Sequence, residues 1–162
     1  PETLAAMNDL AEGYRAGNKP DKVVPLLEET VKLGRRRLGP DHPNTLVGMN
    51  NLATAYQARR QFDLALPLID EAFERSTTNL GLGHPKTLGV LHNLVAIYRD
   101  VGRRADAVSR LEQAFERLKG KRGPRRPEAL AVLNDLAEEY AAVRDARKSV
   151  PVLEEAVELA KE

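Results

Sequence analysis

The feature that most constrains the fold is a motif that recurs every 42 residues. Its clearest copy spans residues 43–56 and reads Pro-Asn-Thr-Leu-Val-Gly-Met-Asn-Asn-Leu-Ala-Thr-Ala-Tyr. All tyrosines of the chain keep this step, at Tyr14, Tyr56, Tyr98 and Tyr140. So do four of the prolines, Pro1, Pro43, Pro85 and Pro127. A fixed period in the range of about 20–50 residues indicates a stacked repeat architecture. We therefore divide the chain into four repeats, 1–42, 43–84, 85–126 and 127–162, of a single domain.

Each repeat is expected to form two helices, A and B. In repeat 2, Pro43 follows Asp41-His42 and suits the first turn of helix A, where the N–H that proline lacks has no partner in any case. The apolar residues of helix A lie at helical spacing, and so do those of helix B. They are Leu46, Met49, Leu52, Ala53 and Tyr56 in helix A, and Leu66, Ile69, Ala72 and Phe73 in helix B. Residues 59–61 form the turn between the helices, and glycines close helix B at Gly39, Gly81 and Gly123.

Three prolines share one register within helix B, at Pro25, Pro67 and Pro151. Proline inside a helix costs about 3 kcal/mol, whereas proline in the first turn costs little. The recurrence therefore places this position close to the start of helix B, and a kinked helix is the alternative.

Composition excludes several classes of function. The net charge is +1 with 30% charged residues, so the chain as a whole does not have the charge of a nucleic-acid or membrane binder. The absence of cysteine removes thiol catalysis and cysteine-ligated zinc. No apolar run reaches the roughly 18 residues of a membrane span, and no signal peptide is visible, so a cytoplasmic location is expected. The chain begins at proline and ends without a closing loop, and we expect it to be part of a longer array.

No catalytic, cofactor or metal site is indicated. The serines Ser76, Ser109 and Ser149 have no histidine nearby in the sequence, and no phosphate-binding loop is present. His42 and His84 lie one period apart before prolines, where they are expected to start helix A rather than to bind a metal, which needs several converging ligands. The chain is therefore not expected to be an enzyme.

The repeat resembles the tetratricopeptide pattern, Trp-x2-Leu-Gly-x2-Tyr followed by Ala-x3-Phe. Repeat 2 reads Met49-x2-Leu52-Ala53-x2-Tyr56 and then Ala65-x3-Ile69. Its 42-residue form, with Gly-Pro-Asp-His-Pro-x-Thr-Leu before Asn-Asn-Leu-Ala, is similar to the repeats of kinesin light chains. It is also similar to bacterial arrays, including arrays appended to serine/threonine kinases. The resemblance implies an all-α fold, a right-handed superhelical solenoid of four helix-turn-helix units with eight helices. Repeat 4 departs from the pattern, because Arg125-Arg126 replaces Asp-His and Ala129 replaces threonine.

In such a solenoid helix A lines a concave groove. Polar residues beside the buried stripe of each helix A are then the candidates for binding a peptide. They are Asn8, Glu12, Arg15, Asn50, Asn51, Thr54, Gln57, His92, Asn93, Arg99, Asn134 and Glu138. Side-chain amides both donate and accept hydrogen bonds, so they can pair with the backbone of an extended peptide. The alternative is that these amides bond to the next helix or to water.

The function expected from these observations is a protein–protein interaction module that binds an extended peptide in the concave groove. A regulatory or scaffolding array of a bacterial signalling enzyme such as a serine/threonine kinase, and a structural self-associating spacer, are the alternatives. The expected partner is a protein or peptide, and neither a nucleic acid nor a membrane is expected as a partner.

Two further stretches carry expectations. Residues Lys119 to Arg126 hold five basic side chains, which either bind an acidic partner or form a solvated loop without a base-stacking aromatic. The apolar stripe of the last helix has no following repeat to cover it, so we expect part of it to be exposed and to promote self-association. This stripe includes Val150, Leu153, Ala156, Val157 and Ala160.

Overall fold

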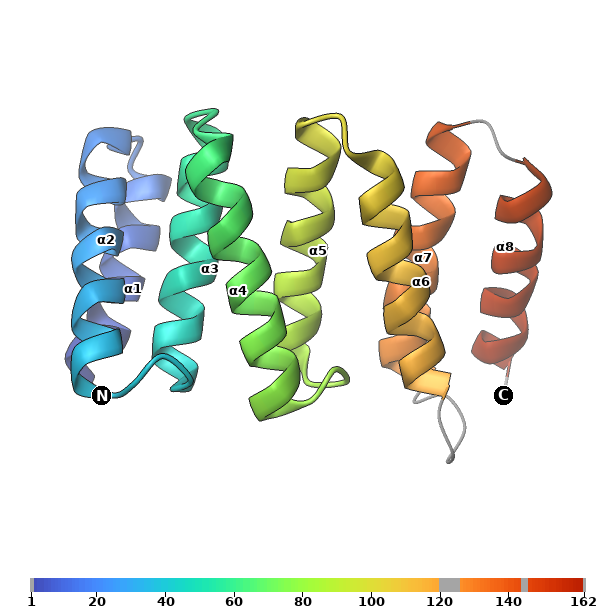
Figure 1. Cartoon of the computed structure of the whole chain (residues 1–162), viewed down its shortest axis with the longest axis horizontal. Coiled ribbons are helices and arrows are strands. Elements are labelled where there is room, and N and C mark those ends of the chain that lie inside the picture. Colours follow the sequence, from blue (N-terminus) through green and yellow to red (C-terminus); the bar gives the residue numbers. More distant parts are fainter. Residues whose placement is uncertain (1, 120–125, 144–145, 162) are drawn as a thin grey trace. The chain divides into compact units, whose positions relative to one another are not determined.

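A computed structural model describes residues 2–119, 126–143 and 146–161. Within these ranges the chain forms eight α-helices and no strand (Figure 1). They are α1 (Glu2–Ala16), α2 (Pro20–Arg37), α3 (Pro43–Ala58), α4 (Phe62–Leu80), α5 (Pro85–Asp100), α6 (Arg104–Lys119), α7 (Arg126–Ala142) and α8 (Ala146–Lys161). The odd-numbered helices are helix A of each repeat and the even-numbered helices are helix B. The all-α class and the two helices per repeat are confirmed.

The chain contains two compact units, Pro1–Asn79 and Leu80–Glu162. In unit 1, α2 packs against both α1 and α3, and α1 also contacts α3. In unit 2, α6 packs against both α5 and α7, α5 contacts α7, and α7 packs on α8. Each unit therefore shows the same stacking, in which helix B of one repeat lies against helix A of its own repeat and of the next.

The structure confirms the residues that were expected to begin helix A and to end helix B. His42 precedes α3 with extended backbone, and its Nδ1 accepts a hydrogen bond of 3.1 Å from the backbone N–H of Asn44. His84 repeats this arrangement before α5, accepting from Lys86 at 3.1 Å. Such a cap satisfies one of the four N–H groups that a helix start leaves without a partner. Gly39, which follows α2, has a φ of 92°, a left-handed conformation that favours glycine.

The prolines of helix B do not lie in the first turn, so this expectation was wrong. Pro25, Pro67 and Pro151 are each the sixth residue of α2, α4 and α8, inside a continuous helix. The helices begin five residues earlier, at Pro20 in the case of α2. At the sixth position the missing N–H removes one hydrogen bond to the carbonyl four residues before it. Tertiary packing therefore keeps these helices intact in spite of the proline.

The predicted stripe of helix A forms the core. Leu46, Met49, Leu52, Ala53 and Tyr56 are all buried in α3. In α4, Ile69, Ala72 and Phe73 are also buried, whereas Leu66 is half-buried. Burial of this apolar surface, at about 25 cal/mol per Å², is the main stabilising contribution to such a fold.

Helices α2 and α3 approach each other closely at a glycine. A Cβ atom placed on Gly34 would lie 2.7 Å from Oγ1 of Thr45 and 3.2 Å from its Cγ2. Both residues are buried, so neither can turn toward water. Glycine at this position is therefore required by the packing of the two helices.

A chain of ion pairs links α2, α4 and the loop before α3. Arg35 binds Glu71 at 2.7 Å, Glu71 binds Arg75 at 2.8 Å, and Arg75 binds Asp41 at 2.7 Å. Hydrogen bonds from Arg75 to Asp41 and then to Glu71 raise the pKa of its guanidinium group. These side chains are partly exposed, so solvent screens each pair and its contribution to stability is small.

Candidate functional site

Unit 1 contains a pocket of about 260 Å³ between α1, α2 and α3. Its inner surface is made by apolar side chains from all three helices. They are Ala11, Val23, Val24, Leu27 and Ala55. Polar side chains form its rim, and these are Glu12, Arg15, Asn18, Asn51, Thr54 and Arg59. The volume is below the roughly 300–1,000 Å³ of sites for drug-sized ligands, so it suits one or two side chains of a larger partner.

Hydrogen bonds within the protein hold this rim in place. The guanidinium of Arg15 forms an ion pair with Glu12 one helical turn away. Thr54 donates from its hydroxyl to the backbone carbonyl of Asn51 at 2.9 Å. Arg59 donates to the carbonyl of Pro20 at 2.8 Å, which ties the end of α3 to the start of α2. The pocket is therefore formed before any partner arrives.

The pocket brings together four of the predicted residues, Glu12, Arg15, Asn51 and Thr54. Asn50 and Gln57 lie on the same helix outside its lining, and both are half-buried. The side chain of Asn50 donates to Oδ1 of Asn51 at 3.5 Å, which is at the limit of a hydrogen bond.

Asn8 does not face the groove as expected. Its side chain is buried, and its Nδ2 donates to the backbone carbonyl of Asn44 on α3 at 3.3 Å. The amide of Asn8 therefore bonds to the next helix A instead of being available to a peptide backbone. We exclude it from the candidate site.

In unit 2 the predicted residues form charged contacts. Nδ1 of His92 on α5 lies 3.2 Å from Oδ2 of Asp135 on α7. Arg99 and Arg104 bind the two carboxylate oxygens of Glu139, at 3.5 Å and 3.0 Å. Glu139 is only 1% exposed. This carboxylate has the same register as Ala55, two periods earlier, which lines the pocket of unit 1.

The remaining predicted residues of unit 2 are Asn93, Asn134 and Glu138. Asn93 is half-buried on α5, whereas Asn134 and Glu138 are exposed on α7. None of them belongs to the Arg99–Glu139–Arg104 cluster. The basic stretch from Lys119 to Arg126 lies outside the residues whose side chains the structure describes.

Sequence reasoning missed Glu139 and the pocket residues Ala55 and Arg59. A signal for Glu139 was present, because it lies beside Tyr140 in a register that holds Ile97 one period earlier. An acidic residue at a position where the other repeats have an apolar or small residue indicates a buried ion pair. Ala55 gave no such signal, because alanine is common throughout these helices.

Other kinds of site were also sought. Among the described residues, no group of three or more acidic, histidine or cysteine side chains is arranged to hold a metal ion. Within the same part of the chain, no helix is long and apolar enough to cross a membrane.

Comparison with known proteins gives one family. The model of the tetratricopeptide repeat family matches residues 2–78, 46–120 and 86–162, which together span almost the whole chain. No match was found among curated proteins.

Solved structures give the same result. The chain is similar to the crystal structure of nearly identical TPR-like repeats from a Podosopora anserina protein designated a kinesin light chain. That match has a TM-score of 0.84 and 30% identity, and it covers 99% of this chain and 76% of the other. A single-residue variant of the same repeats gives a TM-score of 0.84 at 29% identity, over 98% and 75% of the two chains. BtubC (BKLC) from P. vanneervenii shares the fold, with a TM-score of 0.78 at 19% identity, over 98% of this chain and 63% of the other.

Proposed function

Because this chain belongs to the tetratricopeptide repeat family, whose fold mediates protein–protein interaction, we propose that it binds an extended peptide segment of a partner along α1 and α3. In this proposal one apolar side chain of the peptide enters the pocket of unit 1. Ala11, Leu27 and Ala55 then surround that side chain. The pocket, apolar inside and polar at its rim, is the observation that carries the proposal.

The rim supports binding of a peptide backbone. Asn51 offers an amide and Thr54 a hydroxyl, and both groups donate and accept hydrogen bonds. A backbone passing over the pocket presents one N–H and one C=O per residue, so it can pair with both side chains. Since Glu12 and Arg15 pair with each other, the rim has little net preference for a charged ligand.

The repeat register provides the experiment. Ala55→Glu places in unit 1 the residue that repeat 4 has at the same position, and the longer side chain should fill the pocket. The matched control is Thr78→Glu, which adds the same charge on the exposed side of α4. Peptides selected by display against the wild-type chain serve as ligands, and calorimetric titration measures Kd.

We expect Ala55→Glu to raise Kd at least tenfold, equivalent to about 1.4 kcal/mol, while Thr78→Glu leaves it unchanged. Asn51→Ala should weaken binding by roughly fivefold, because one hydrogen bond contributes about 1 kcal/mol. Circular dichroism verifies that each variant is folded. An unchanged Kd in folded Ala55→Glu would exclude the pocket as the binding site.

A further inference from the structure

Unit 2 repeats the apolar walls of the unit 1 pocket. Helices α5, α6 and α7 pack on one another as α1, α2 and α3 do, two periods earlier. Three wall residues recur with the same type. They are Val24, Leu27 and Ala58, which return as Val108, Leu111 and Ala142. Ala11 and Val23 return in exchanged order, as Val95 and Ala107, so their summed volume is the same. These walls therefore do not distinguish the two units.

One wall residue differs, and its side chain is long. At the register of Ala55, repeat 4 has Glu139. Its carboxylate lies 3.5 Å from Nη1 of Arg99 on α5 and 3.0 Å from Nη1 of Arg104 on α6. Both arginines have the register of residues that line the unit 1 pocket, namely Arg15 and Pro20. The side chain of Glu139 therefore extends from α7 to the counterparts of pocket residues on the other two helices.

Burial shows that Glu139 points into the protein. Ala55 is partly exposed, whereas Glu139 is only 1% exposed although its side chain is longer. A larger side chain at the same register is less exposed only if it enters the space between the helices. Because the walls around that space recur from unit 1, the space that Glu139 enters is the counterpart of the pocket.

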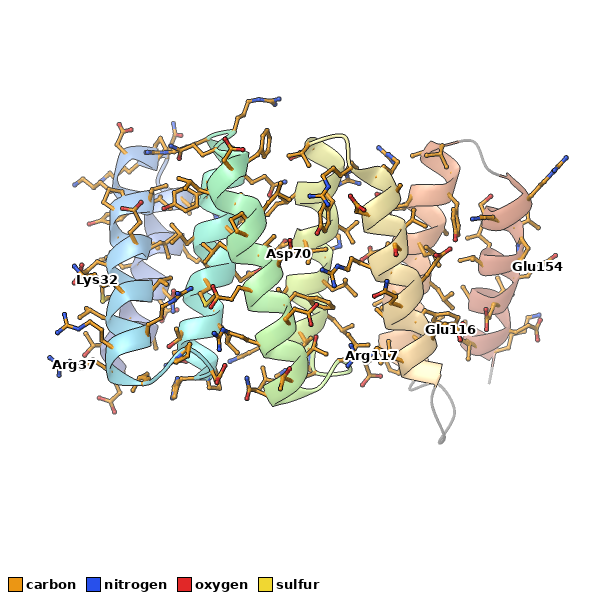
Figure 2. All side chains as sticks on the ribbon, viewed as in Figure 1. Lys32, Arg37, Asp70, Glu116, Arg117 and Glu154 are labelled. Atoms are coloured by element: carbon orange, nitrogen blue, oxygen red, sulfur yellow. The ribbon has the colours of Figure 1, made fainter. Side chains whose placement is uncertain are left out.

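The two arginines hold the carboxylate in this space. A carboxylate that leaves water needs partners, and each guanidinium supplies one while remaining partly exposed itself. Arg104 is the first residue of α6. Figure 2 shows Glu116 and Arg117 toward the other end of this helix, so these charges do not take part in the cluster. The position of the acid is thus fixed from α5 and α6.

We propose that Glu139 is a built-in plug, which closes the unit 2 counterpart of the pocket and confines the binding of an apolar peptide side chain to unit 1. Arg99 and Arg104 are positioning residues that keep the plug in place. The closure stands on the contacts of Glu139 alone, whereas the choice between the units rests on the proposed function. Glu139 is therefore a residue that determines specificity, in addition to joining three helices.

The first test needs no peptide. Because the chain has no cysteine, one introduced thiol reports access to one position. Val95→Cys places a thiol in the unit 2 wall and Val23→Cys places one in the unit 1 wall, and cysteine is a small apolar substitute for valine. The core control is Val132→Cys, since Val132 is 1% exposed and its counterpart Gly48 does not line the pocket. Mass spectrometry measures the rate of reaction with N-ethylmaleimide.

The Val23→Cys thiol should react readily and the Val95→Cys thiol slowly. Glu139→Ala should raise the Val95→Cys rate about tenfold or more, and it should leave the Val132→Cys rate unchanged. Glu139→Ile removes the charge but keeps a large side chain, so the Val95→Cys thiol should stay protected. An equal Val95→Cys rate with and without Glu139, or an equal rise in the alanine and isoleucine variants, would overturn the plug.

A reciprocal variant decides the matter if Glu139→Ala loosens unit 2, which a fast reaction of Val132→Cys would reveal. Ala55→Glu together with Pro20→Arg gives unit 1 the acid and the second arginine of unit 2. In the Val23→Cys background, these changes should slow the reaction about tenfold or more. If the thiol keeps its full reactivity in the folded variant, an acid at this register does not close the pocket and the proposal fails.

The second test asks whether the plug limits the number of peptide sites. Asp135→Asn with Glu138→Thr gives the unit 2 rim the residues that unit 1 has at these registers, and it keeps the plug. Glu139→Ala added to this pair removes the plug. Calorimetric titration uses a peptide selected by display against the wild-type chain. The wild type and the pair should bind one peptide per chain, and the triple variant should bind two.

The two tests separate this inference from the proposed function. If Ala55→Glu leaves the peptide Kd unchanged, the pocket is not the peptide site, and the confinement of binding to unit 1 falls with the proposed function. The thiol rates still decide whether Glu139 closes the space in unit 2. If the thiol becomes reactive but the triple variant binds only one peptide, Glu139 closes the space without determining where the peptide binds.

Discussion

The hydroxyl of Tyr56 on α3 donates a hydrogen bond of 2.6 Å to Oε1 of Glu28 on α2. Burial of the ring, together with this carboxylate, raises the pKa of Tyr56 to about 12. Tyr140 and Glu112 form the same pair between α7 and α6. The contact therefore joins helix B of one repeat to helix A of the next in both units.

We expect Tyr56→Phe to lower the free energy of unfolding by about 1 kcal/mol. A hydrogen bond to a charged acceptor contributes about 1.5–3 kcal/mol, and the exposed position of Glu28 reduces this value. Urea unfolding measures the difference. Tyr14→Phe is the control, studied at a dilution where the chain is monomeric, and it should leave the stability unchanged. Equal losses in the two variants would argue against a contribution from the hydrogen bond.

The same pair predicts a dependence of stability on alkaline pH. The pKa of Tyr56 is raised from 10.0 to about 12 by folding, so the unfolded chain loses this proton first. The stabilisation is complete below pH 10 and is lost as the pH rises toward 12, because the native state then binds more protons than the unfolded state. Urea unfolding between pH 8 and 12 should show a steeper decline for the wild type than for Tyr56→Phe. Parallel curves would contradict the assignment.

Two glycines of unit 1 should respond in opposite ways to alanine. Gly34→Ala places a methyl group 2.7 Å from Oγ1 of Thr45, and such overpacking costs about 1–3 kcal/mol. Gly13→Ala meets no atom within 4 Å in helix α1, so it should stabilise the protein by about 0.5–1 kcal/mol. Thermal melting of both variants measures the two effects.

A second substitution checks the cause of the first. Thr45→Ala in the Gly34→Ala background removes Oγ1 and Cγ2, the two nearest atoms that the new methyl group would meet, so it should recover part of the lost stability. If the double variant is no more stable than Gly34→Ala, the close approach of α2 and α3 is not the reason for the loss.

Removing the two arginines of the Glu139 cluster should lower the free energy of unfolding more than removing the carboxylate. Loss of both arginines, in Arg99→Ala with Arg104→Ala, leaves a buried carboxylate without a partner and should cost about 3–5 kcal/mol. Glu139→Ile introduces the residue found in this register at Ile97, and the arginines can then turn to water. It should therefore change stability by less than about 1 kcal/mol, as chemical denaturation can determine. A larger loss in Glu139→Ile than in the double variant would contradict this reasoning.

The period alone predicted most of the fold. Pro43 and Pro85 were expected at helix starts and both are the first residues of their helices. Tyr56 and Leu52 were expected in the core and both are buried. These features depend on local rules, namely helix capping and the spacing of apolar residues. The start of helix B was predicted too close to the proline. A proline costs little free energy near a helix start, but it does not determine which residue begins the helix.

The site was predicted less well, since it depends on what lies across from each residue. Asn8 and His92 share one register, yet Asn8 is buried and His92 is exposed. Gly48 on α3 leaves room beside Asn8, where an added Cβ would lie 3.4 Å from Oδ1 of the amide. In unit 2 the counterpart of this glycine is Val132. The position within a repeat therefore gives the face of the helix, whereas the neighbouring helix decides whether the side chain reaches solvent.

The pairing of Tyr56 with Glu28 also bears on how such a gene can change its length. The contact crosses the border between repeats 1 and 2, so this border does not separate two independent pieces of structure. If residues 29–70 were excised, Tyr98 would follow Glu28 at the spacing that Tyr56 has now. Excising one period from any other point restores the same spacings. Unequal recombination can therefore add or remove a full period wherever the crossover falls and still keep every tyrosine beyond Tyr14 at 28 residues after an acid.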